Sequence, residues 1–226
     1  MGGKTAQPTA KARPARRVQD PEGVRNNIIE IATQEFAANG YNGARVDEIA
    51  ARTNTSKRML YYYFGDKEGL FRAVLEEGYR RMRQVEARRR FDHLEPTAAL
   101  RALVEFTFDH QNANADFIRL VMVENIHNGV HLARSENIER LNVPAITTLR
   151  DIYQRGVAAE VFRPGLDVVD LHMSISALSF FNVANRATFS RIFRREMGTP
   201  AALSRRRKIV VDLILRYVKN DVGPPG

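Results

Sequence analysis

The chain has 226 residues, 44% of them hydrophobic, so it can bury a sizeable core. Lys and Arg outnumber Asp and Glu by 35 to 26, and the resulting net charge of +9 favours an anionic partner. The absence of cysteine excludes disulfides, thiolate chemistry and a cysteine zinc site. No apolar run reaches the ~18 residues of a membrane span, and the N-terminus lacks the apolar core of a signal peptide. We therefore expect a cytoplasmic protein without a membrane segment.

Residues 1–19 are rich in Ala, Thr, Pro, Lys and Arg and offer almost nothing to bury. We expect them to form a disordered basic arm. Such an arm either contacts phosphates or a minor groove, as homeodomain arms do, or is a solvated tail. At the other end, residues 221–226 are expected to be a short tail.

The first helix is predicted to begin at Pro21. Asp20 is a capping residue, Pro21 suits the first helical position, and Glu22 places an acid in the first turn. Apolar residues then recur at three- and four-residue spacing, as in an amphipathic helix: Val24, Ile28, Ile31, Ala32 and Phe36. Gly40 is expected to end this helix in a left-handed conformation.

The stretch 45–64 predicts two short helices joined by a tight turn. Asn54 can adopt the left-handed conformation that such a turn needs. Ser56 is a good N-cap for the second helix, which places Leu60 and Phe64 four residues apart on its buried side. A helix packed across another after a short turn is the geometry that enters a DNA major groove.

A set of separated residues in this region resembles the signature of TetR-type transcriptional regulators: Ile49-Ala50, Ser56, Leu60 to Phe64, Asp66-Lys67-Glu68 and Leu70-Phe71. The resemblance covers roughly residues 24–84. It implies an all-α fold, with a three-helix helix-turn-helix domain at residues 20–84 and a larger helical effector-binding and dimerisation domain at residues 85–220. Asn54 replaces the usual turn glycine and keeps the turn, and Thr55 replaces the usual apolar residue after it. Arg58 replaces a small residue of the recognition helix, so we expect a different operator sequence to be read.

The resemblance also suggests which residues contact DNA. At positions that match those of the family, Lys67 and Tyr61 are expected to hold phosphates, and Tyr62 either contacts the backbone or packs. The residues expected to face base edges are Thr55, Lys57, Arg58 and Met59.

Beyond Pro96 every segment again reads as helix, with no strand alternation or hairpin signal. A helix that starts after Asp66 should run to about Arg90. The later helices are expected near residues 97–112, 115–128, 138–160, 168–187 and 201–219, with a short piece around 190–196. Pro144 is tolerable only near a helix start, so its helix should begin at Asn142 or kink there.

The last two long helices carry more apolar surface than one small domain can cover. Residues 168–183 are apolar nearly all round. In 201–219 one apolar stripe is expected: Leu203, Val210, Leu213, Ile214, Tyr217 and Val218. The resemblance implies that these two helices pair with those of a second subunit in a four-helix bundle. A two-fold homodimer would present two recognition helices to a palindromic operator.

Polar residues interrupt several apolar helix faces: His110, Glu124, Asn125, His127, His172, Ser176, Asn182 and Asn185. They either orient a small-molecule effector or are satisfied core and interface groups. The candidate pocket comprises Phe106, His110, Phe117, Met122, Asn125, Ser176, Phe180 and Phe181. Such a lining suits a mostly apolar effector with one or two polar groups.

No pattern predicts catalysis, a cofactor or a metal. A serine elbow, a glycine-rich phosphate loop and an acid/base pair are all missing from the sequence. His127 and His131 are four residues apart, but Gly129 between them argues against a continuous helix. The main hypothesis is an effector-responsive dimeric repressor. The alternative is an architectural or nonspecific DNA-binding protein, which would bind any duplex with similar affinity.

Overall fold

The computed structural model describes residues 20–220, so the predicted basic arm (1–19) and tail (221–226) lie outside the described residues. Within them the fold is all-α, as predicted, apart from one isolated bridge between Phe162 and Lys219. The helices are α1 (Pro21–Gly43), α2 (Val46–Arg52), α3 (Lys57–Phe64), α4 (Lys67–Ala87), α5 (Pro96–Ala113), α6 (Ala115–Ile126), the short 3-10 helix η1 (Leu132–Arg134), α7 (Ile138–Ala158), α8 (Val168–Ala184), α9 (Arg186–Ile192) and α10 (Pro200–Val218).

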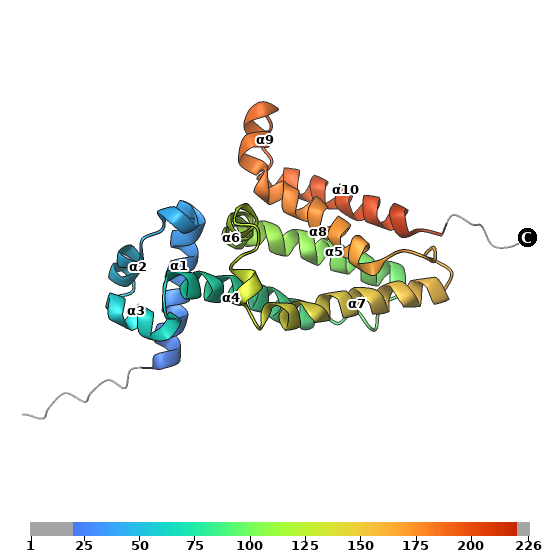
Figure 1. The fold of residues 1–226 in the computed structure, drawn as a ribbon. Coiled ribbons are helices and arrows are strands. Elements are labelled where there is room, and N and C mark those ends of the chain that lie inside the picture. Colours follow the sequence, from blue (N-terminus) through green and yellow to red (C-terminus); the bar gives the residue numbers. More distant parts are fainter. Residues whose placement is uncertain (1–19, 221–226) are drawn as a thin grey trace, which may run out of the picture.

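The helices form a small group and a large group that share α4. Helices α1, α2 and α3 lie together at one end, and α4 runs from them into the larger group (Figure 1). There α5 packs against α7, α8 and α10, while α6 lies against α1. The two groups are therefore in direct contact through α4 and α6.

Each group has its own apolar core. The smaller one is built around Phe36, Ile49, Leu60 and Phe71, and Leu120 of α6 also belongs to it. The larger core joins α5, α7, α8 and α10 through a set of buried residues that includes Leu100, Phe108, Leu149, Leu171, Val210 and Ile214. Because α6 contributes a side chain to the smaller core, movement of α6 would disturb the packing of the first three helices.

The helix ends agree with two expectations and correct others. Gly40 has φ +69° and ψ 176°, so regular helical geometry stops there as expected, and one further turn follows across a kink within α1. Helix α7 begins at Ile138, as the predicted 138–160 helix does, and not at Asn142, so it contains Pro144. The carbonyl left without a donor is that of Arg140, an exposed residue, so water can satisfy it. Helix α9 begins at Arg186, four residues before the expected piece, directly after α8.

The single apolar stripe expected on α10 is also wrong. Val210 and Ile214 are only 0% and 2% exposed because they pack in the chain's own core, so they cannot meet a partner subunit. Leu213 and Tyr217 are each 46% exposed and point to another side of the helix. An α-helix turns about 100° per residue, so the apolar residues of α10 lie on two sides of the helix and not on one face.

Candidate functional site

The turn between α2 and α3 has the conformation that the sequence predicts. Asn54 adopts φ +52°, and the Ser56 hydroxyl accepts a hydrogen bond from the Met59 amide at 3.2 Å. The Thr53 hydroxyl donates to the Ile49 carbonyl at 2.8 Å and closes the end of α2. Leu60 is buried, which fixes the opposite face of α3 toward solvent.

The solvent face of α3 carries most of the predicted DNA contacts. Lys57, Arg58, Tyr61 and Tyr62 are exposed, with Tyr62 at 80%, and Thr55 and Met59 are half-buried. The Lys57 ammonium lies 3.1 Å from the Asp47 carboxylate, whose hydrogen bond raises the pKa of Lys57. The guanidinium of Arg58 has no ion-pair partner among residues 20–220, so it is free to meet an incoming acceptor.

Lys67 lies at the start of α4, beside this face. Its Nζ donates to the Asn42 carbonyl at 3.3 Å and stands 5.2 Å from the centre of the Tyr41 ring. Partial burial lowers the pKa of Lys67. The ammonium is thus held near α2 and α3, the two helices of the predicted helix-turn-helix, by weak contacts that a phosphate could replace. We call α2 and α3 the reading helices.

Glu35 supports the reading helices and was not predicted. It is 8% exposed on α1 and accepts hydrogen bonds from the Arg45 amide at 3.1 Å and the Asn39 side chain at 2.9 Å. Arg45 has no capping side chain of its own, so α1 supplies the acceptor at the start of α2. The sequence does contain one signal for this role, because Glu35 is a carboxylate that lies between Ala32 and Phe36 on an otherwise apolar helix face.

A second unpredicted feature is the junction loop, residues 127–135, which joins α6 to α7. Glu124, 2% exposed, accepts hydrogen bonds from the amides of His131 and Leu132 at 2.9 Å each, and its other oxygen lies 2.6 Å from His131 Nδ1. The His131 ring in turn lies 4.5 Å from that of Tyr41 and 4.9 Å from that of Phe71. The carboxylate therefore holds the loop against α1 and α4.

Two side chains of the junction loop also bind α4 directly. Arg134 Nη1 contacts both carboxylate oxygens of Glu68, at 2.6 and 2.7 Å. The Ser135 hydroxyl donates to Glu76 at 2.6 Å. Since α4 begins within the smaller helix group, these bonds tie the larger group to the reading helices.

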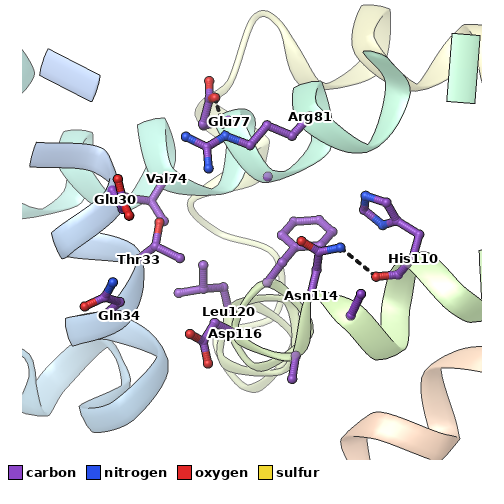
Figure 2. Close-up of a pocket in the computed structure, with 14 residues that line it drawn as sticks. Glu30, Thr33, Gln34, Val74, Glu77, Arg81, His110, Asn114, Asp116 and Leu120 are labelled. Carbon is purple, nitrogen blue, oxygen red and sulfur yellow. Dashed lines mark hydrogen bonds and ion pairs between the residues drawn. The ribbon is translucent and has the colours of Figure 1, made fainter. Parts of the chain in front are cut away.

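The junction cavity, of 350 Å³, opens between the two groups. Figure 2 shows α1 side chains on one side, α4 on another, and the α5–α6 corner opposite. Its lining residues are Glu30, Thr33, Gln34, Val74, Glu77, Gly78, Arg81, His110, Ala113, Asn114, Ala115, Asp116, Phe117 and Leu120. Its volume lies within the ~300–1,000 Å³ typical of small-molecule sites.

The cavity combines an apolar floor with fixed polar groups. Arg81 Nε donates to Glu77 at 2.7 Å, which holds that carboxylate in place. The Nδ1 atom of His110 is buried and, within the described chain, has no hydrogen-bond partner. Burial and then the positive charge of Arg83 lower the pKa of His110, so its imidazole is neutral near pH 7. It can therefore accept or donate one hydrogen bond.

A buried ion pair lies on α4 near His110. Arg83 bonds to Glu86, and their side chains are only 11% and 8% exposed. Burial lowers the pKa of Arg83 and raises that of Glu86. Within residues 20–220, Arg83 Nε and Gln111 Oε1 have no hydrogen-bond partner. Buried polar atoms without a hydrogen-bond partner are rare in proteins. Their presence here shows that the interior of the larger group contains polar atoms that are not satisfied.

The predicted pocket residues fall in different places. His110 and Phe117 line the junction cavity, whereas Phe181 lines another. Phe106 is buried on α5, Phe180 packs near Phe117, and Met122 is half-buried. Asn125 is exposed and bonds to a carbonyl of its own helix, and the Ser176 hydroxyl lies 3.5 Å from His172. None of the predicted pocket residues lies on α1 or α4, which form the other walls of the junction cavity.

Among residues 20–220, no three His, Asp or Glu side chains come together in a way that could hold a metal ion. No helix within that range is both long and apolar enough to cross a membrane.

Comparisons with known proteins agree with this geometry. Residues 28–74 match the family described as bacterial regulatory proteins, tetR family, and residues 96–214 match the tetracyclin repressor-like C-terminal domain. The chain is 34% identical over 203 residues to the HTH-type transcriptional repressor NicS of Pseudomonas putida, a match that covers 90% of this chain and 96% of that protein.

Solved structures share the fold. A bacterial regulatory protein of the tetR family from Rhodococcus RHA1 superposes with TM-score 0.68 at 22% identity, over 87% of this chain and 97% of that one. The transcriptional regulator FadR from Bacillus subtilis, solved in complex with stearoyl-CoA, gives TM-score 0.64 at 17% identity, over 84% and 97%. From the matched family models and the reading helices it follows that this chain belongs to the TetR family of DNA-binding transcriptional regulators.

Proposed function

We propose that this protein is a homodimeric repressor that a small-molecule effector releases from a palindromic operator. The free Arg58 and the exposed tyrosines of α3 supply the contacts to DNA, and the similar protein NicS is named a transcriptional repressor. The proposed role is binding alone, without a catalytic step, in the cytoplasm where the operator lies.

The junction cavity is the observation that carries the effector proposal. Its walls come from α1 and α4, which position the reading helices, and from the α5–α6 corner of the larger group. A ligand between these walls would favour one arrangement of the two groups over another. Glu30 and Asp116 at the cavity disfavour an anionic effector, and neutral His110 favours one with a hydrogen-bonding group.

The proposed dimer surface is the exposed apolar side of α8 and α10. Val169, Met173 and Phe181 follow one side of α8, and Ile209, Leu213 and Tyr217 recur every four residues on α10. Contiguous exposed apolar surface of this kind is typical of an interface. Pairing these helices around a two-fold axis would give two copies of α3 for the two half-sites.

The test begins with footprinting of the DNA upstream of the protein's own and neighbouring genes. A protected palindrome, bound at least ~10³-fold more tightly than random duplex, supports a specific regulator. Equal affinity for both duplexes would instead support the nonspecific alternative.

Substrates of the neighbouring genes are then tested for release of the operator. Ala113→Phe should fill the cavity from the α5 side and abolish release while operator affinity stays unchanged, because Ala113 lies outside the reading helices. Ala158→Phe, at the exposed end of α7, is the matched control and should respond as the wild type does. Normal release from the Ala113→Phe protein would show that the effector binds elsewhere.

A further inference from the structure

A second cavity, of 240 Å³, lies where α8, α9 and the start of α10 meet. It shares no residue with the junction cavity. We call it the basic groove, and its lining residues are Phe181, Asn182, Phe189, Arg195, Met197, Ala202, Arg205, Arg206 and Ile209. In Figure 1, α9 stands up where the end of α8 and the start of α10 lie, and most lining residues come from these three helices.

The floor of the basic groove is apolar and well fixed. The rings of Phe181 and Phe189 meet edge to face, with centroids 5.7 Å apart. Asn182 is 2% exposed, and its amide donates to Asn112 of α5 at 2.7 Å. Arg186 donates to the same Asn112 oxygen at 2.7 Å. These bonds anchor the end of α8 and the start of α9, so the aromatic wall is held in position.

The charge on the rim of the groove is not compensated. Arg195, Arg205 and Arg206 line it together, and no Asp or Glu is among the lining residues. Within residues 20–220 none of the three forms an ion pair, whereas the adjacent Arg207 binds Asp109 at 2.7 Å. Like charges around one cavity repel each other, and a bound anion would remove that repulsion. Guanidinium groups bind carboxylate and phosphate oxygens especially well.

We infer that the basic groove binds a small amphiphilic anion, a carboxylate or phosphate attached to a compact apolar body. The apolar body would lie on the phenylalanine floor, and the anionic group would meet the arginines. The volume of 240 Å³ is below the ~300–1,000 Å³ of ordinary ligand sites, so a short chain or a single ring fits better than a long acyl chain.

This site differs from the proposed effector site in charge as well as in place. Glu30, Glu77 and Asp116 contribute acid to the junction cavity, whereas the basic groove contains cations alone among its charged residues. Phe181 and Ile209 also belong to the exposed rows proposed for the dimer, so the anion and the partner subunit would compete for that end of the surface. The inference concerns binding in the absence of DNA and does not depend on the effector response.

Calorimetric titration of the full-length protein, without DNA, tests the inference. The probes are octanoate and hexyl phosphate, with octan-1-ol as the uncharged body and sulfate as the anion without a body. Saturable binding is expected for the first two, with Kd below about 1 mM and at least tenfold tighter than for the alcohol or sulfate. A preference between octanoate and hexyl phosphate identifies which anionic group the arginines receive.

Variants then locate the bound probe. The double substitution Arg205→Gln, Arg206→Gln should weaken octanoate binding at least about tenfold, and Arg195→Gln alone should weaken it less. Arg191→Gln, an exposed arginine of α9 outside the groove, is the matched control and should bind as the wild type does. Melting temperatures verify folding, and Arg195→Gln serves if the double variant is unstable.

Three results would overturn the inference. The first is undiminished octanoate binding by the arginine variants, together with its loss in Ala113→Phe, which would place the probe in the junction cavity. Another is sulfate binding as tight as octanoate binding, which would reveal a simple cationic patch. The last is no binding of any probe up to about 10 mM, as expected if a partner subunit fills the groove.

Discussion

Lys57 and Arg58 are neighbours at the start of α3, and their charges are used differently. Asp47 holds the Lys57 ammonium within hydrogen-bond distance, so a DNA base or phosphate must compete with this carboxylate for Lys57. Arg58 has no such partner within the described chain and extends from the exposed face. We therefore expect Arg58 to contribute more to sequence discrimination than Lys57, because a free guanidinium can bind a guanine edge with two hydrogen bonds.

Arg58→Ala is expected to cost about 1–3 kcal/mol on the operator and almost nothing on random duplex. Lys67→Ala should instead weaken binding to both duplexes and reduce the salt slope by roughly 1, as loss of a phosphate contact does. Anisotropy titrations at several salt concentrations measure both effects. An equal loss on operator and random DNA would remove Arg58 from base reading.

His110 and His172 make stability depend on pH. Burial is the main reason that the pKa of each is lower than the usual 6.5, with Arg83 adding to it. The unfolded chain therefore binds more protons as the pH falls through that value, so the free energy of unfolding should decrease from pH 7.5 to pH 5 (about one unit or more on either side of 6.5).

Replacing both histidines by Gln should flatten this dependence, as urea denaturation at the two pH values would measure. His93→Gln is the matched control, since its side chain is 66% exposed. An unchanged pH dependence in the double variant would contradict the assignment to these two imidazoles.

Among the elements, the junction loop is held by two side chains, Glu124 and Arg134, whose contributions to the free energy of unfolding should differ. Glu124 is buried and accepts two backbone hydrogen bonds. Glu124→Gln should lower the free energy of unfolding by about 1–3 kcal/mol, because an amide cannot satisfy every donor around it. Arg134 is 61% exposed, so Arg134→Ala should cost less than about 1 kcal/mol. It should still weaken effector-induced release of DNA, because the loop loses its bond to α4.

Urea denaturation and operator release, measured on both variants, separate the two roles. Full effector response from the Arg134→Ala protein would show that the tie to Glu68 transmits nothing. A stability loss for Arg134→Ala as large as that for Glu124→Gln would contradict the difference in burial.

Sequence patterns predict the elements well where the signal is local. Asn54, Ser56 and Asp66 each bond within a few residues, so turn and caps could be read directly. The junction cavity could not be predicted, because Thr33 and Asn114 line one cavity only after α1 packs on α6. The two apolar sides of α10 could not be separated for a related reason. Hydropathy does not show which side packs in the core of the same chain and which side remains exposed.

At the scale of the whole molecule, substitutions on the exposed and the buried side of α10 test whether the exposed side forms the proposed dimer interface. Leu213→Glu should yield a folded monomer, since this residue is 46% exposed in one chain and a charge would be buried only in the dimer. Ile214→Glu, at 2% exposure, should unfold the larger core instead. Sedimentation gives the mass and circular dichroism the helicity. A dimeric Leu213→Glu protein would move the interface away from this row.

The junction cavity and the support of α2 depend on neighbouring residues of α1, so effector preference and operator affinity cannot be changed independently on that side. Thr33 and Gln34 line the cavity, and the next residue, Glu35, caps α2. Selection for a new inducer through substitutions on this wall will also alter operator affinity, so the two traits are pleiotropic there. His110 and Ala113 line the cavity from α5, which packs against α7, α8 and α10 in the larger group. A biosensor library directed at that wall can change inducer preference alone, and divergence among natural homologues should follow the same asymmetry.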